Sequence, residues 1–410
     1  MTTADRWRRR TRTAAVLLPV AIGVAAGGCG RGTEPHLDTA AGAPAATTAA
    51  PPPAATSGPP PAASSTPTPA PAPASTATPA ATAPARLREP VDRAAAQVLL
   101  LGFGGTELSP EVAARLAAHE WGGVVLAPGN GTTAEQVAAL VGQLGATAAG
   151  AGHRPPLIAA LQPGGVADAV PVGPPVQATI ASADGAERQA RRAAGQLRDL
   201  GIRLVLAPDA DVGSAGGPWE GRAFSDDHAT VSAFAQAAAS GWMRGGVAPA
   251  PGHFPGEGGA SGDPALEPAT VGLSLDELRG RDLQPFAALA ARVPAMQLSA
   301  ATFVAFDGVT PATLLPDAVG LLRGELGFDG VVISGDLAAA SLASGESVAR
   351  AAVAALAAGC DLLWIPGGAE DQEAAWRAIA RAVRRGDVPK ARLADALRRV
   401  DALRARYHLG

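Results

Sequence analysis

Lysine and cysteine are scarce in this chain, and each shortage excludes a class of protein. Lys390 is the only lysine among 410 residues, and the formal net charge at pH 7 is −4. An acidic chain without a basic stripe is a poor match for nucleic acid or for an anionic membrane surface, so neither is predicted as a direct partner. The two cysteines, Cys29 and Cys360, are too few for a disulfide framework.

The first 28 residues have the three parts of an export signal. Residues 14–26 form an apolar run that is too short to span a bilayer comfortably, and Gly27 and Gly28 follow it. Cys29 comes next, where a bacterial lipoprotein signal receives its lipid. The basic residues before the run are Arg6, Arg8, Arg9, Arg10 and Arg12. We predict an exported protein, lipid-anchored through Cys29 to the outer face of the bacterial cytoplasmic membrane.

The next segment, residues 29–85, consists mainly of alanine, proline, threonine and serine. Such a segment has hardly any large apolar side chain, so it cannot bury enough surface to offset the entropy lost on ordering. Its proline content favours an extended, partly polyproline conformation. We predict a disordered tether between the anchor and the rest of the chain.

From residue 86 to residue 410, short apolar runs alternate with alanine-rich amphipathic stretches. Short runs that are apolar throughout are typical of parallel strands buried on both faces. The predicted strands are 98–102, 122–126, 157–161, 203–207, 246–250, 294–298, 330–334 and 361–365. The predicted helices are 110–120, 133–144, 186–200, 227–243, 275–292, 317–326, 347–358, 370–385 and 390–409.

Eight strand–helix units over about 320 residues predict an α/β fold of the (β/α)₈ TIM-barrel type. The alternative is an open, doubly wound sheet, which carries a glycine-rich phosphate turn after its first strand. Residues 102–105 read Gly-Phe-Gly-Gly, but Thr106 follows and the G-x-G-x-x-G spacing is absent. The barrel is therefore favoured, and neither a cofactor nor a metal site is predicted.

Six stretches, in order, resemble the N-terminal barrel of glycoside hydrolase family 3. Among them, residues 201–212 resemble "GINLNFAPVLDV", 253–256 resemble part of "KHFPGHG", and 326–334 resemble "LGFDGVVVS". The other three stretches are 102–109, 121–126 and 221–224. The resemblance is closest to the single-domain β-N-acetylhexosaminidase branch, which trims or recycles peptidoglycan. It implies hydrolysis of O-glycosyl bonds in a barrel mouth.

The resemblance also places the catalytic groups, and this chain departs from it at both. A retaining glycosidase needs a nucleophilic carboxylate and an acid/base about 5 Å away. The family's nucleophile is the first aspartate of "SDD", where this chain has Gly335, and Asp336 matches the second. The branch's acid/base is an Asp–His pair in "GHGDTxxDSH". Its aspartate is Asp263 here, its histidine is replaced by Ala265, and Glu257 occupies the motif's first histidine position.

The residues that hold the sugar are altered as well. Leu161 replaces the aspartate of "DQEGGRV", Val166 replaces its arginine, and Gly252 replaces the motif lysine. The histidine of "TAH" corresponds to Ser299 when counted from Met296 and to Ala300 when counted from Asp307.

Three polar residues of the family's pattern remain. Arg222 and His253 fit two roles equally, binding ligand hydroxyls or a carboxylate, or supporting the barrel rim by hydrogen bonds. For Asp211 we favour capping of the next turn.

Three hypotheses follow for the function. The preferred one is a catalytically degenerate family member, a pseudoenzyme that binds cell-wall saccharide or an envelope protein partner. The second is an active β-N-acetylglucosaminidase that uses a relocated carboxylate, Asp336 or Glu257. The third is a structural envelope protein with a closed barrel mouth, favoured by the apolar residues at Leu161 and Val166.

Overall fold

A computed structural model describes residues 86–409 of the chain. The predicted export signal, the lipidated Cys29 and the tether at 29–85 lie outside these residues. Within them, no helix combines the length and the apolar character needed to cross a membrane.

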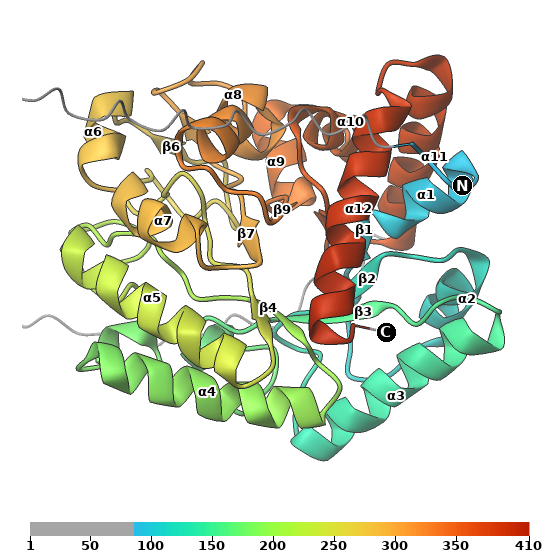
Figure 1. Ribbon diagram of the computed structural model, residues 1–410, viewed down its shortest axis with the longest axis horizontal. Coiled ribbons are helices and arrows are strands. Elements are labelled where there is room, and N and C mark those ends of the chain that lie inside the picture. The colour runs from blue at the N-terminus through green and yellow to red at the C-terminus, as the bar shows by residue number, and fades with distance from the viewer. Residues whose placement is uncertain (1–85, 410) are drawn as a thin grey trace, which may run out of the picture. The chain divides into compact units, whose positions relative to one another are not determined.

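Eight short parallel strands form the centre of the described region (Figure 1). Each lies inside one of the eight predicted runs, because those runs are apolar throughout and are buried on both faces. The strands are β1 (Leu99–Leu101), β2 (Gly123–Leu126), β3 (Leu157–Leu161), β4 (Leu204–Leu206), β5 (Ala248–Pro249), β7 (Ala295–Gln297), β9 (Val331–Ile333) and β10 (Leu363–Ile365). A separate pair, β6 (Thr270–Val271) and β8 (Thr302–Phe303), lies outside this set.

Main-chain hydrogen bonds close these strands into a ring. Six of them pair in the order β10-β1-β2-β3-β4-β5, and β7 pairs with β9. Between β5 and β7, the Gln297 amide donates to the Pro251 carbonyl at 2.8 Å. Between β9 and β10, the Ser334 amide donates to the Leu362 carbonyl at 2.8 Å. The predicted α/β fold with a parallel, TIM-type sheet is therefore confirmed.

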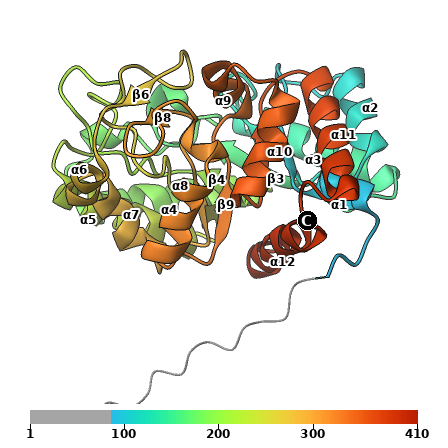
Figure 2. The same cartoon turned by 90° about the horizontal axis from the view of Figure 1, so that it is seen from above.

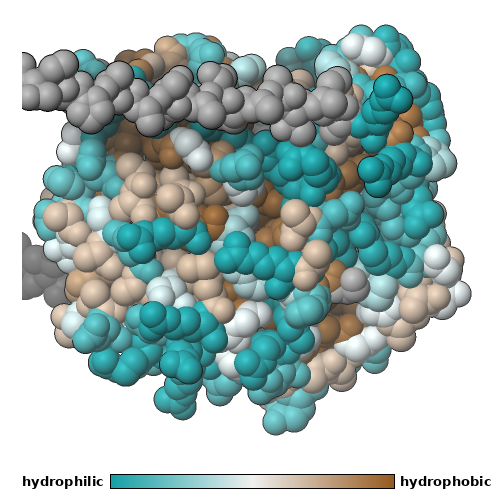
Figure 3. All heavy atoms as spheres, viewed as in Figure 1, coloured by the Kyte–Doolittle hydropathy of each residue, from teal (hydrophilic) through white to brown (hydrophobic). Residues whose placement is uncertain are grey.

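Helices surround the ring and alternate with its strands. Most begin at the side-chain caps that the sequence offers, such as Ser109, Thr133, Ser182 and Ser347. The helices are α1 (Val91–Gln97), α2 (Pro110–Ala118), α3 (Ala134–Gly150), α4 (Ala183–Asp199), α5 (His228–Arg244), α6 (Leu275–Gly280), α7 (Leu283–Ala290), α8 (Pro316–Gly320), α9 (Leu337–Ser344), α10 (Val348–Ala358), α11 (Ala369–Arg385) and α12 (Lys390–Tyr407). Figure 3 shows polar residues along the outer side of α4, whose alanines face the core.

The structure corrects several predicted helix limits. The helix predicted to end at residue 144 continues through Gly145 to Gly150, because Gly145 meets no neighbour and alanines follow it. The helix predicted at 275–292 is two, α6 and α7, broken where Arg281 turns to donate to the Val212 and Gly213 carbonyls. A π-helical turn at Leu321–Glu325 replaces the end of the helix predicted at 317–326. Helices α1 and α9 were not predicted.

Helix α12 covers the amino end of the ring, opposite α9, β6 and β8 (Figure 2). Its Val400, Leu403 and Tyr407 pack with the inward-facing residues of the strands, such as Leu100 and Leu157. The buried Arg404 guanidinium also donates to the carbonyls of residues 122 and 155, which precede β2 and β3. This end is therefore closed, and the carboxyl ends of the strands form the only open side of the ring in the described region.

A buried carboxylate fastens α12 to the ring. Asp361, fully buried just before β10, accepts hydrogen bonds from Arg392 of α12 at 2.7 Å and from Arg323 at 2.8 Å. It also accepts from the Val332 amide of β9 at 3.0 Å. One side chain thus joins β9, the π-helical turn and the helix that closes the barrel.

Replacing this carboxylate should destabilise the barrel strongly. Asp361→Ala leaves two largely buried guanidinium groups without their shared anion, so we expect the free energy of unfolding to fall by about 3–5 kcal/mol. Asp387→Ala, which breaks a solvent-exposed pair with Arg385, is the matched control and should cost less than about 1 kcal/mol. Urea denaturation measures both. Equal losses in the two variants would contradict the role assigned to Asp361.

Candidate functional site

The carboxyl ends of the strands enclose a cavity of about 170 Å³. This is the end at which TIM-barrel proteins carry their sites. One wall is apolar, with Leu161, Leu206 and Trp364 at the ends of β3, β4 and β10. The opposite wall is polar and comes from the loops that follow β4 and β5. Its residues are Asp209, Trp219, Arg222, His253, Glu257 and Asp263.

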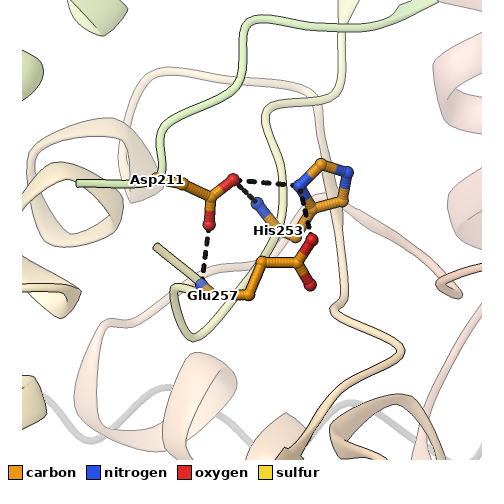
Figure 4. A group of neighbouring side chains, drawn as sticks. All are labelled: Asp211, His253 and Glu257. Atoms are coloured by element: carbon orange, nitrogen blue, oxygen red, sulfur yellow. Dashed lines mark hydrogen bonds and ion pairs between the residues drawn. The ribbon is translucent and has the colours of Figure 1, made fainter. Parts of the chain in front are cut away.

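Asp211 organises the polar wall from behind (Figure 4). Its fully buried carboxylate accepts from the His253 imidazole Nδ1 at 2.9 Å, the His253 amide at 3.2 Å and the Glu257 amide at 2.8 Å. The predicted cap of the following turn is therefore wrong. Asp211 instead joins the loop after β4 to the loop after β5, and it sets the positions of two side chains that line the cavity.

His253 is held as a cation. Burial by itself lowers the pKa of this imidazole, but the Glu257 and Asp211 carboxylates outweigh burial and raise the pKa to about 10. Its Nδ1 lies 3.4 Å from a Glu257 oxygen. The folded pKa lies above the ordinary value of about 6.5. The attraction between the imidazolium and the two carboxylates therefore stabilises the fold fully below about pH 6.5, and this stabilisation is lost as the pH rises through about 10.

Glu257 faces Ser299, one of the two positions considered for the family's histidine. The Ser299 hydroxyl donates to the Glu257 carboxylate, and both residues are buried. Ser299, and not Ala300, therefore contacts the polar wall. Burial raises the pKa of Glu257 to about 7, against the lowering effect of the His253 cation.

Asp211, His253 and Glu257 also form a group that could hold a metal ion, because one ligand atom from each lies within 4.8 Å of the others. The chemistry of this donor set does not fit. The Asp211 oxygens already accept three N–H donors, and the same Nδ1 that would bind a metal donates to Asp211. A histidine binds a metal through a ring nitrogen that carries no proton, and here the contact with Asp211 already occupies Nδ1. No metal is assigned to the group.

Arg222 is paired within the mouth. Its guanidinium donates to the Asp263 carboxylate at 2.9 Å and lies 4.2 Å over the Trp219 ring. The other neighbour of Trp219 is the His253 ring, with centroids 5.2 Å apart. Asp263, the retained half of the family's Asp–His pair, is thus an ion-pair partner of Arg222. Ala265, at the histidine position, is exposed on the same loop and lines the cavity.

Gly335, at the position of the family's nucleophile, is packed closely against the chain after β7. A Cβ atom built there would lie 2.9 Å from the Ala300 nitrogen and 3.0 Å from the Leu298 oxygen. The first contact is shorter than real Cβ atoms show, the second is tight, and both are with main-chain atoms that cannot rotate away. A side chain at residue 335 would therefore need this main chain to shift.

Asp336 does not replace the missing carboxylate. Its Oδ1 accepts from the Ala338 and Ala339 amides at 2.7 and 3.0 Å and so caps α9. Burial raises the pKa of Asp336, but the residue is not among those that line the cavity. Asp336, one residue past the position of the family's nucleophile, therefore has a structural role.

Strand β3 ends without a polar side chain that lines the cavity. Leu161 lines the cavity, while the neighbouring Gln162 points into the protein and donates to the Val170 and Gly173 carbonyls. Val166 is 99% exposed and therefore does not fill the mouth.

Asp209, Gln297, Trp219 and Trp364 line the cavity but were not predicted to belong to the site. Asp209 lies two residues past a predicted strand, a position that places a polar side chain at the mouth of a barrel. That signal was available in the sequence.

Comparisons with known proteins agree with this geometry. The family model described as "Glycosyl hydrolase family 3 N terminal domain" matches residues 91–403. A relative from Stenotrophomonas maltophilia (strain K279a), named "Beta-hexosaminidase", is 35% identical over 282 residues, which are 65% of this chain and 83% of that protein.

Two solved structures match the same fold. The β-N-acetylhexosaminidase from Beutenbergia cavernae superposes with a TM-score of 0.70 at 28% identity, over 77% of this chain and 99% of that one. A family 3 β-N-acetylglucosaminidase from Paenibacillus sp. gives a TM-score of 0.70 at 30% identity and covers 78% of this chain, which spans 62% of that protein. The family model and these matches show that the chain belongs to glycoside hydrolase family 3.

Proposed function

We propose that this protein is a family 3 member that has lost hydrolysis and binds a cell-wall saccharide in its barrel mouth. The observation that carries the proposal is Gly335, whose surroundings leave less than 3 Å between a Cβ atom and the main chain of Ala300. A covalent mechanism cannot proceed without its nucleophile, and loss of that group alone costs several orders of magnitude in rate.

The neighbouring groups support the loss. Asp336 is used as the cap of α9, and Asp263 is paired with Arg222 instead of relaying a proton through a histidine. Two carboxyl groups about 5 Å apart on either side of a sugar are the minimum for retaining hydrolysis. The family positions retain neither member of such a pair in working form.

Saccharide binding is supported by what remains. The polar wall offers a charged imidazole, a guanidinium and carboxylates, while Trp364 supplies an aromatic surface on the opposite wall. A cavity of about 170 Å³ argues against the structural alternative of a closed mouth. Similar proteins are named β-hexosaminidases, which makes an amino sugar the natural ligand class.

A residual β-N-acetylhexosaminidase is the second candidate, and Glu257 is the observation that favours it. This carboxyl lines the cavity, and burial raises its pKa to about 7, as expected of a general acid at neutral pH. The same candidate would need a second carboxylate in the mouth, for which Asp209 is available. The version of this alternative in which Asp336 is the relocated carboxylate is not retained, because Asp336 caps α9.

Turnover distinguishes the two candidates. Purified protein should hydrolyse an aryl N-acetyl-β-glucosaminide no faster than a buffer blank, because no nucleophile stands at residue 335. Glu257→Gln and Asp336→Ala should give the same background rate. Turnover by the wild type that disappears in Glu257→Gln would establish the second candidate and contradict the proposal.

Restoring the nucleophile alone should fail and should also weaken the fold. Gly335→Asp forces a side chain against the main chain of residues 298–300, so we expect about 1–3 kcal/mol of destabilisation and no gain in turnover. Gly142→Asp is the matched control, since Gly142 lies on the exposed face of α3 with nothing within 4 Å. Thermal unfolding and the glycosidase assay measure both. A stable, active Gly335→Asp variant would show that the nucleophile space is open.

The proposed location is the outer face of the bacterial cytoplasmic membrane, with lipid on Cys29. In its native host, the wild-type protein should partition into detergent and membrane fractions, and mass spectrometry should find a lipidated Cys29. Cys29→Ala should move the protein to the aqueous fraction or leave the signal uncleaved. Cys360→Ala is the control, because that thiol is buried in the barrel wall and should not affect partition. An unlipidated wild-type protein in the aqueous phase would contradict this assignment.

A further inference from the structure

Four polar side chains around the mouth cavity have no partner within the described residues. Asp209 is 7% exposed and Gln297 is 3% exposed, and both line the cavity. Neither the Asp209 carboxylate nor the Gln297 amide makes a hydrogen bond or ion pair with residues 86–409. The indole Nε1 atoms of Trp219 and Trp364, which line the same cavity, are buried without an acceptor. Buried polar groups are nearly always paired, so four unpaired groups at one cavity point to a ligand.

The charges of the mouth identify the kind of ligand. Arg222 is paired with Asp263, and His253 is held between Asp211 and Glu257. Each cation is therefore already in contact with at least one carboxylate. Asp209 feels the charges of His253 and Arg222, which lower its pKa, but its carboxylate makes no hydrogen bond or close ion pair with either. Mainly because of burial, the pKa of Asp209 is raised to about 6. An unpaired buried carboxylate favours a ligand that supplies a positive charge.

The backbone leaves space beside this carboxylate. Asp209 forms a parallel bridge with Gly252, so the two residues stand next to each other where β4 and β5 leave the ring. Gly252 stands where the family motif has lysine, and it has no side chain to reach Asp209. Residue 252 therefore supplies no cation to Asp209.

We infer that the mouth binds a small ligand carrying a free ammonium group, which pairs with Asp209 while Gln297 hydrogen-bonds to its neutral polar groups. The inference rests on the proposed function in taking the mouth as a saccharide site, and it names the class as a hexosamine whose amine is not acetylated. The cavity of about 170 Å³ is below the 300–1,000 Å³ usual for larger ligands, which restricts it to about one ring.

Titration with three matched sugars tests the inference. Glucosamine carries the ammonium, N-acetylglucosamine blocks it, and glucose replaces it with a hydroxyl. A charge-assisted hydrogen bond contributes enough to give glucosamine at least about tenfold tighter binding than either neutral sugar. Asp209→Asn should abolish that preference. Asp307→Asn, on another loop and away from the cavity, should keep it. Equal binding of the three sugars by the wild type, or a preference that survives Asp209→Asn, would overturn the inference.

A second measurement needs no added ligand. Gly252→Lys places an ammonium next to Asp209, and Gly252→Met adds a side chain of similar length without charge. A Cβ at residue 252 meets only the Gln297 side chain, at 3.2 Å, which can move aside. We expect the lysine variant to melt at least about 2 °C above the methionine variant, and this difference should vanish when Asp209 is also changed to Asn. Equal melting temperatures in the presence of Asp209 would overturn its role as the ammonium partner.

The outcomes separate this inference from the proposed function. Binding of all three sugars without preference, together with no turnover, leaves the proposed function in place and removes only the ammonium ligand. Hydrolysis of the aryl N-acetyl-β-glucosaminide would contradict the proposed function, whichever of the three sugars the protein prefers.

Discussion

Closure of the strand ring is the constraint on which the rest of this structure depends. Short strands of two to five residues bury little surface individually, and it is the hydrogen bonds from β5 to β7 and from β9 to β10 that join them into one barrel. Closure creates an interior, which α12 seals at the amino end with Val400, Leu403 and Tyr407. It also brings the carboxyl ends of all eight strands to one mouth, so residues from distant parts of the chain come into contact.

Within that mouth, one buried carboxylate sets the arrangement of the polar wall. Asp211 accepts three N–H donors from the loop after β5, and so it positions both His253 and Glu257. The imidazolium in turn keeps two carboxylates close together despite their burial. The loops after β4 and β5 are therefore held together by electrostatics, which fixes the polar wall of the cavity.

The positions at which this chain departs from the family motif contact their neighbours closely. The main chain of residues 298–300 packs against Gly335, within about 3 Å of where a Cβ atom would lie. Ser299 in turn contacts Glu257, which stands at a histidine position of the family motif. Asp263, left without its histidine neighbour, pairs with Arg222. These contacts link the positions that differ from the family motif, so a change at one of them is felt by its neighbours.

The sequence by itself determined the eight strands and the family, because runs buried on both faces are apolar throughout and the motif residues follow them at constant spacing. It also located Arg222, His253 and Glu257 at the mouth. Only the tertiary structure decided their roles, since these depend on contacts across the ring: Asp211 is buried beneath two loops, and the Asp209 carboxylate lines the cavity without a hydrogen bond. The break between α6 and α7 has the same cause, because Arg281 reaches carbonyl groups 68 and 69 residues away. Local periodicity does not contain such distant contacts, and they exist only once the barrel has closed.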